Sequence, residues 1–238
     1  MEDFSFETSN VALFLRTVAQ ALHLAQRHIQ HLHVEGLLPE LIQNTEPLRH
    51  LFTGLESIIL DMRGVEFLRE GMPPSAMTYL FECARPTVRS IKIMGSYYPH
   101  LPERGVHSVA NLFFNQDGKT PKVFPHLQSL YLRTLIISTQ PFIDFLAAQP
   151  NISNLRVYYV YLATPSLGWL HVATSLPATV LEWTVGNLGH EPVPGYVSPI
   201  AYNWTKIWRA WEEPLLHETG WKGSFGLNKQ GFIMNRIS

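Results

Sequence analysis

The segments Leu127-x-x-Leu130-x-Leu132-x-x-Leu135-x-Ile137 and Ile152-x-x-Leu155-x-Val157-x-x-Val160-x-Leu162 repeat one apolar pattern 25 residues apart. A third copy, Ala178-x-x-Leu181-x-Trp183, follows 26 residues later, and Leu188 lies beyond it at the expected place. Shorter copies come earlier, as Ile29-x-x-Leu32-x-Val34, Leu55-x-x-Ile58-x-Leu60 and Val88-x-x-Ile91-x-Ile93. The second apolar position of the six copies therefore falls at residues 32, 58, 91, 130, 155 and 181.

This periodicity predicts the fold. Self-similarity at a period of roughly 20 to 29 residues with leucine at fixed offsets is typical of leucine-rich repeats. Side chains alternate along a strand, so each copy predicts a short strand with its Leu, Ile or Val side chains inward. Parallel strands need a crossover, which returns the chain along the outer side. We therefore predict an α/β leucine-rich-repeat solenoid of about six repeats, a curved parallel sheet with outer helices and with helical caps at both ends.

The 238 residues are predicted to form one domain. Residues 1–188 hold the solenoid and begin with an amphipathic helix over residues 8–28, which would cover the exposed end of the core. Residues 189–238 are predicted to be a Trp-rich C-terminal cap and tail of the same domain, with Trp204, Trp208 and Trp211 on one helix face. We expect residues 219–238, which are glycine-rich and polar, to be partly disordered.

Composition excludes several function classes. The formal net charge is −1, and nucleic-acid-binding proteins usually carry a basic stripe, so we expect no nucleic-acid partner. The single Cys83 excludes an internal disulfide framework and a cysteine-rich zinc site. Neither a secretory leader nor an apolar run of about 18 to 20 residues occurs, so we expect no membrane partner and a cytoplasmic or nuclear location.

The outward positions of the strands are candidates for binding, because in a curved solenoid they line the concave face. In the predicted register they are His31, His33, Glu35, Ser57, Ile59, Asp61, Ser90, Lys92, Met94, Ser129, Tyr131, Arg133, Asn154, Arg156, Tyr158, Val180, Glu182 and Thr184. Tyr and Arg carry much of the energy of protein interfaces. We predict a protein-binding patch made by Tyr131, Arg133, Arg156 and Tyr158, with Glu182 and Asp61 to either side and Lys92 on the same face. The alternative is an ordinary solvated sheet face.

Three stretches carry a resemblance to a known family. FPHLQSLYLRTLIIS (124–138), FIDFLAAQPNISNLRVYYVYL (142–162) and GWL (168–170) resemble the repeat region of fungal F-box and leucine-rich-repeat-like proteins. The resemblance covers residues 124–188 and, more weakly, residues 29–93. It implies a curved receptor surface and an N-terminal F-box helical module that docks an adaptor of a ubiquitin ligase.

No F-box is recognisable in this sequence. LLPELIQ at 37–43 is similar to the opening of one, but the helical continuation is missing and a repeat strand precedes it. This argues against binding to a ubiquitin-ligase adaptor, and we expect a protein partner that the sequence does not identify.

No catalytic fingerprint accompanies the repeats, since neither Gly-x-Ser-x-Gly nor Gly-x-x-x-x-Gly-Lys occurs. We predict non-catalytic protein–protein recognition through the concave face, without a cofactor and, by resemblance, as an F-box-like substrate receptor. One alternative is a structural or assembly subunit that contacts partners through the Trp-rich tail. Another is a metal-dependent enzyme in which His31, His33 and Glu35, on one strand face, bind a divalent ion. The sequence names no further ligand for that ion, and coincidence is the simpler interpretation in a chain with 11 histidines.

Overall fold

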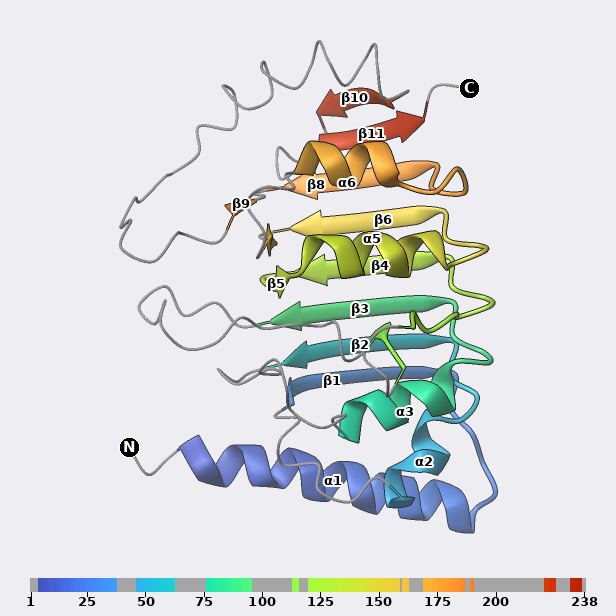
Figure 1. Ribbon diagram of the computed structural model, residues 1–238. Coiled ribbons are helices and arrows are strands. Elements are labelled where there is room, and N and C mark those ends of the chain that lie inside the picture. The colour runs from blue at the N-terminus through green and yellow to red at the C-terminus, as the bar shows by residue number, and fades with distance from the viewer. Residues whose placement is uncertain are drawn as a thin grey trace.

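Six parallel strands follow one another in chain order through the sheet of this α/β fold (Figure 1). The computed structural model describes residues 4–37, 46–62, 76–95, 113–115, 120–158, 160–162, 169–186, 189–190, 221–225 and 232–236. The strands are β1 (His31–Leu37), β2 (Ser57–Met62), β3 (Ser90–Gly95), β4 (Ser129–Arg133), β6 (Asn154–Tyr158) and β8 (Glu182–Gly186). Each is parallel to the strand before it.

The apolar copies set the register of these strands. Cα partners link Leu32, Ile58, Ile91, Leu130 and Leu155 in succession, which are the equivalent positions of the first five copies. All five side chains are buried, and the residues on either side of Leu130 are more exposed, as alternation along a strand requires. The parallel arrangement and the register predicted for these five copies are therefore confirmed.

The predicted register of the sixth copy is wrong by two residues. Leu155 pairs with Trp183 and not with Leu181, and Val180 takes the place of Leu127 and Ile152 just before the strand. Val180 and Trp183 are fully buried, whereas Leu181 is 60% exposed. Packing accounts for the choice, because burying the large indole removes more apolar surface from water than burying Leu181 would. Val180 consequently points into the core and not outward as predicted.

Helices cover one face of the sheet. In Figure 1, α3 (Ala76–Ala84), α5 (Thr139–Ala147) and α6 (Trp169–Ser175) lie on the same side of it. Phe142, Phe145 and Leu146 of α5 join the same buried cluster as the inward strand residues. In the described part of the chain, no helix combines the length and the apolar character that crossing a bilayer requires.

Two helices, α1 (Phe4–Leu24) and α2 (Glu46–Phe52), lie at the β1 end of the sheet (Figure 1). The helix predicted over residues 8–28 thus exists but is displaced toward the N-terminus. It ends where Gln26 adopts a φ of 50° and the amide of Arg27 donates to the carbonyl of Leu22 at 2.9 Å, a pattern that stops helices. Leu15 and Ala19 of α1 are buried in the core cluster, so this helix covers the apolar end of the sheet.

Two smaller features complete the described fold. A second parallel sheet joins β5 (Ile136–Ile137), β7 (Tyr161–Leu162) and β9 (Gly189–His190), which follow β4, β6 and β8 at the same offset. The tail forms a hairpin of β10 (Trp221–Phe225) and β11 (Phe232–Arg236), and β11 pairs antiparallel with β8. These two strands lie within residues 219–238, for which we expected partial disorder. Trp204, Trp208, Trp211 and residues 38–43 of LLPELIQ lie outside the described residues.

Candidate functional site

The outward positions of the six strands form three rows on the sheet face opposite α3, α5 and α6, which we call the polar face; of these positions, Thr184 is buried and Gly186 has no side chain. Strand register places one residue of each strand in each row. In chain order, the first row is His31, Ser57, Ser90, Ser129, Asn154 and Glu182, the second is His33, Ile59, Lys92, Tyr131, Arg156 and Thr184, and the third is Glu35, Asp61, Met94, Arg133, Tyr158 and Gly186. The rows bring together residues that are as much as 151 positions apart in the chain, from 31 to 182.

Tyr131, Arg133, Arg156 and Tyr158 form a two-by-two arrangement on β4 and β6, which we call the Tyr–Arg block. Tyr131 is the Cα partner of Arg156, and Arg133 is the Cα partner of Tyr158, so each tyrosine lies beside an arginine of the other strand. The two tyrosine rings meet along the diagonal with centroids 5.6 Å apart and planes tilted by 34°. Both arginines are exposed and both tyrosines half-buried. The arrangement follows from the sequence, because Tyr-x-Arg at 131–133 is followed 25 residues later by Arg-x-Tyr.

Lys92 of β3 extends this block by one strand. Its Nζ lies 4.9 Å from the centroid of the Tyr131 ring, within the range of a cation–π interaction. The two side chains stand on directly paired residues, so the contact needs no departure from the strand register. A cation, an aromatic ring and a second cation, that of Arg156, thus follow one another along the second row.

Glu182 of β8 bounds the block on its other side. Its Oε1 accepts a hydrogen bond from Asn154 Nδ2 at 2.8 Å and lies 3.8 Å from a terminal nitrogen of Arg156. Arg156 also donates from Nε to Asn154 Oδ1 at 3.1 Å. Asn154 therefore holds both charged groups, a role that the sequence does not predict. The Arg156–Glu182 ion pair itself is long and partly solvated, so its own contribution to stability is small.

Burial changes the acidity of one group in the block. It raises the pKa of Tyr158, nearby Tyr131 and Glu182 act in the same direction, and Arg156 opposes them. Tyr158 is consequently a neutral phenol at physiological pH, and its hydroxyl can donate a hydrogen bond to an acceptor on a ligand.

Asp61 and Glu182, predicted to either side of the patch, lie at different distances from it in the structure. Asp61 of β2 is separated from Arg133 of β4 by Met94 of β3 in the third row, so it lies a full strand away from the block. Glu182 instead shares an ion pair with a member of the block. The acidic part of the polar face lies on β1 and β2, where Asp61 is paired with Glu35.

His31, His33 and Glu35 stand on β1 at the edge of the sheet. His33 Nε2 lies 3.5 Å from Glu35 Oε1, and both side chains are exposed. Among the residues that the structure describes, no group of three or more His, Cys, Asp or Glu side chains could hold a metal ion.

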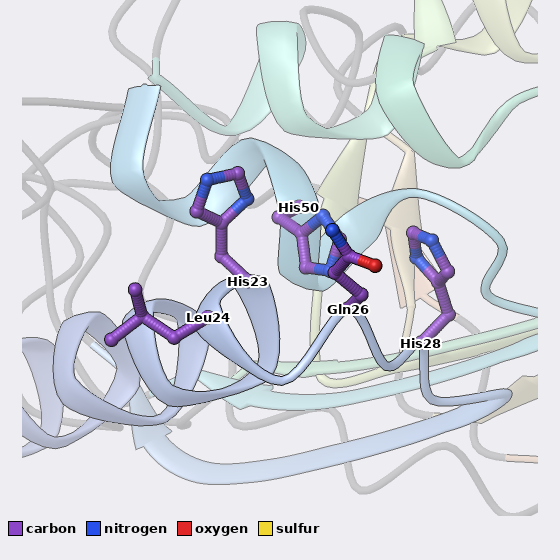
Figure 2. A pocket seen from close by; sticks show the side chains of 5 residues that line it. All are labelled: His23, Leu24, Gln26, His28 and His50. Atoms are coloured by element: carbon purple, nitrogen blue, oxygen red, sulfur yellow. The ribbon is translucent and has the colours of Figure 1, made fainter.

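A second cluster of polar side chains lies where α1 meets α2. His23, His28 and His50 line an open hollow of about 500 Å³ together with Leu24 and Gln26, as Figure 2 shows. The ring of His50 lies 4.3 Å from that of His28 and 5.1 Å from that of His23, and His50 Nε2 is 2.9 Å from the carbonyl oxygen of Arg27. These contacts join the loop after α1 to α2, which explains the cluster as part of the packing at this end of the sheet.

A buried polar network, which the sequence did not predict, ties the segment before β4 to α3 and α5. The side chain of Lys122 is fully buried, donates from Nζ to the carbonyl of Thr78 at 3.0 Å and lies 3.3 Å from Glu82 Oε1. Gln149 accepts from the amide of Phe124 at 2.9 Å and donates to the carbonyls of Lys122 and Phe145, each at 2.8 Å. Every one of these interactions is internal, so we assign the network to stability and not to binding.

Cys83, the single cysteine of the chain, has a partly buried side chain on α3. Burial raises the pKa of its thiol, which keeps the sulfur protonated and weakly nucleophilic at neutral pH.

Comparison of the chain with protein-family models, with curated proteins and with solved structures finds no match in any of the three.

Proposed function

We propose that this chain is a leucine-rich-repeat solenoid that recognises another protein, without catalysis, through the Tyr–Arg block of its polar face. The observation that carries the proposal is the block itself, with two adjoining tyrosines, two exposed arginines and Lys92 on three successive strands. Tyr and Arg are the residue types that contribute most at protein interfaces, because both offer a large contact area together with hydrogen-bond donors.

A recurring hydrogen-bond pattern supports the solenoid part of the proposal. At each of five junctions, one carbonyl just before a strand accepts from two consecutive amides at the start of the next strand, at 2.8 to 3.1 Å. The accepting carbonyls belong to Gln30, Glu56, Arg89, Gln128 and Ser153. One local geometry repeated at every step is what a stack of equivalent coils requires.

By resemblance, we further propose that the chain acts in the cytoplasm or nucleus as the receptor part of an F-box-like protein. The resembling stretches, 124–138 and 142–162, contain all four residues of the Tyr–Arg block.

The alternative function, an assembly subunit that contacts partners through its tail, can be compared with the contacts of the described tail residues. The hairpin of β10 and β11 occupies the β8 edge of the sheet, so among the described residues the tail makes internal contacts.

Site-specific photo-crosslinking tests the proposal. We would place p-benzoylphenylalanine at Tyr158 on the polar face and, as a matched control, at the exposed Ala147 of α5 on the helical side. In extract of the source cells, we expect one discrete crosslinked product from position 158 and none from position 147. Replacing Arg133 and Arg156 together with Ala should remove that product while the thermal unfolding midpoint stays within about 2 °C.

Two outcomes would contradict the proposal. Equal crosslinking from both positions would mean that the polar face has no special affinity for a partner. Loss of the product together with a large fall in the unfolding midpoint would mean that the arginines act on the fold and not on binding.

A further inference from the structure

Among the outward residues of the six described strands, every Lys and Arg lies close to the tyrosine pair. Lys92, Arg133 and Arg156 lie on β3, β4 and β6, and the two tyrosine rings lie among them. Beyond this area the charge changes sign, with Glu182 on one side and the paired Asp61 and Glu35 on the other. A ligand that complements the block therefore carries negative charge over a short distance only.

The width of the positive area limits the length of that ligand. β3 and β6 are separated by two strand spacings, or about 10 Å, which an extended peptide covers with about three residues. A longer acidic stretch would run over Asp61 and meet like charge. These limits disfavour a nucleic-acid strand, whose charge is continuous and whose binding usually needs a longer row of cations.

The side chains of the block match carboxylates in particular. A guanidinium offers two parallel donors to a carboxylate, and such paired hydrogen bonds are among the strongest in proteins. Arg156 can make them at small cost, because its contact with Glu182 is 3.8 Å long and partly exposed to water. The tilted rings of Tyr131 and Tyr158, 5.6 Å apart, offer an apolar surface between the cations for one aromatic or aliphatic side chain.

We propose that the Tyr–Arg block and Lys92 bind a short acidic segment of a partner protein, in which carboxylates flank an aromatic or aliphatic side chain. This inference rests on the proposed function and gives the chemistry of the partner. Carboxylates pair with Arg133, Arg156 and Lys92, and the side chain between them packs on the two tyrosine rings.

A selection from displayed random nonapeptides tests the inference. We would select against the wild-type chain and, in parallel, against a variant that combines Lys92→Glu, Arg133→Glu and Arg156→Glu. An Arg49→Glu variant serves as the control, since Arg49 is an exposed cation on α2, away from the polar face. We expect Asp or Glu next to an aromatic or aliphatic residue in the peptides that bind the wild type and the control. The triple variant should instead select Lys and Arg.

Affinities of the best wild-type peptide, measured by fluorescence anisotropy, make the expectation quantitative. Arg133→Ala and Arg156→Ala should each weaken binding about tenfold or more, and Arg49→Ala should change it less than twofold. Raising NaCl from about 50 to 500 mM should also weaken binding, because the contacts are charged and close to solvent.

The possible failures separate this inference from the proposed function. Selected peptides that depend on the block but lack acidic residues would overturn the inference and leave the proposed function standing. If no selected peptide depends on the block, the inference and the proposed use of this face both fail. Block-dependent binding of a ten-nucleotide oligothymidylate, with no acidic peptide selected, would also overturn both.

Discussion

The Tyr–Arg block and the buried network around Gln149 contain similar polar groups in opposite surroundings. In the network, Lys122 and Gln149 are fully enclosed and their hydrogen bonds join segments of the chain to one another. In the block, Arg133 and Arg156 are exposed at the surface of the sheet. Enclosed polar groups destabilise a protein strongly when they lose a partner, whereas exposed ones change stability little. The two sites contain similar polar groups, so burial, and not residue type, distinguishes the stabilising site from the candidate binding site.

Gln149→Ala should give the largest effect. It leaves the amide of Phe124 without its acceptor and the carbonyl of Lys122 without its donor, in a region that excludes water. We expect the free energy of unfolding to fall by about 3 kcal/mol, from unsatisfied polar groups and a small cavity together. Urea unfolding followed by circular dichroism measures this fall.

Gln149→Glu is the matched control for that change. It keeps the volume and the oxygen that accepts from Phe124, but it loses the two donated hydrogen bonds. It should also be destabilising, since a carboxyl group in place of the amide faces two carbonyl oxygens. A fall below about 1 kcal/mol for Gln149→Ala would show that the network contributes little and would remove the contrast with the block.

Substitution of Lys122 should give the next largest effect on stability, and the size of that effect depends on the replacement. Lys122→Ala removes a buried aliphatic stem and should cost about 2 kcal/mol. Lys122→Met fills the same space without the charge and should change stability by less than about 1 kcal/mol, because burying an ammonium group offsets much of what its partners contribute. Equal losses for both variants would mean that the charge itself stabilises the fold.

Burial of the charged group of Lys122 should also make the free energy of unfolding depend on pH, which an apolar side chain at this position would not do. Burial lowers the pKa of Lys122 from its ordinary 10.5, although Glu82 opposes this effect. Between the lowered folded-state pKa and 10.5, the unfolded chain binds more protons than the folded one, so this group makes stability rise with pH in that interval. The difference in unfolding free energy between the wild type and Lys122→Met, measured from pH 8 to 10.5, should therefore shift in favour of the wild type.

The fold could be predicted from the sequence where local pattern and packing agree. Alternation of apolar residues located all six parallel strands, since each strand must bury one face against the helices. The sixth register failed because Leu181-x-Trp183 and Trp183-x-Val185 have the same alternation, and only the choice of which residue packs against Leu155 separates them. Glu182 and Thr184 keep their outward position in either register, although Thr184 is buried, whereas Val180 and Leu181 each lie on the side opposite to the one predicted.

Other features of the structure could not be predicted from local sequence patterns. The strands β10 and β11 contain Gly223 and Asn235, which have low strand propensity; β11 pairs with the edge of β8, and β10 pairs with β11. The Lys122 side chain donates a hydrogen bond to the carbonyl of Thr78, which lies 44 positions earlier in the chain. No spacing rule in the sequence predicts such a contact. In the site, the sequence predicted which residues share a face, but the bridging role of Asn154 depends on side-chain conformations.

The smallest expected effect is a shift in the pKa of Tyr158, which belongs to the Tyr–Arg block. Because burial raises its pKa above the ordinary 10.0, the folded state favours the neutral phenol. The stability from this shift is fully present below pH 10 and is lost as the pH rises through the raised folded-state value. Carbon-13 NMR of ring-labelled tyrosine should therefore show Tyr158 titrating above 10.0.

Variants of its neighbours should move the pKa of Tyr158 in directions that the block determines. Arg156→Ala removes a favourable partner of the phenolate and should raise the pKa further, whereas Glu182→Gln removes a repulsive one and should lower it. Arg49→Ala, away from the polar face, should leave it unchanged within error. If Arg156→Ala does not move the pKa, the arginine does not lie close enough to Tyr158 to act with it on one ligand. The Tyr–Arg block would then be four independent side chains, as ordinary and as solvated as the rest of the sheet surface.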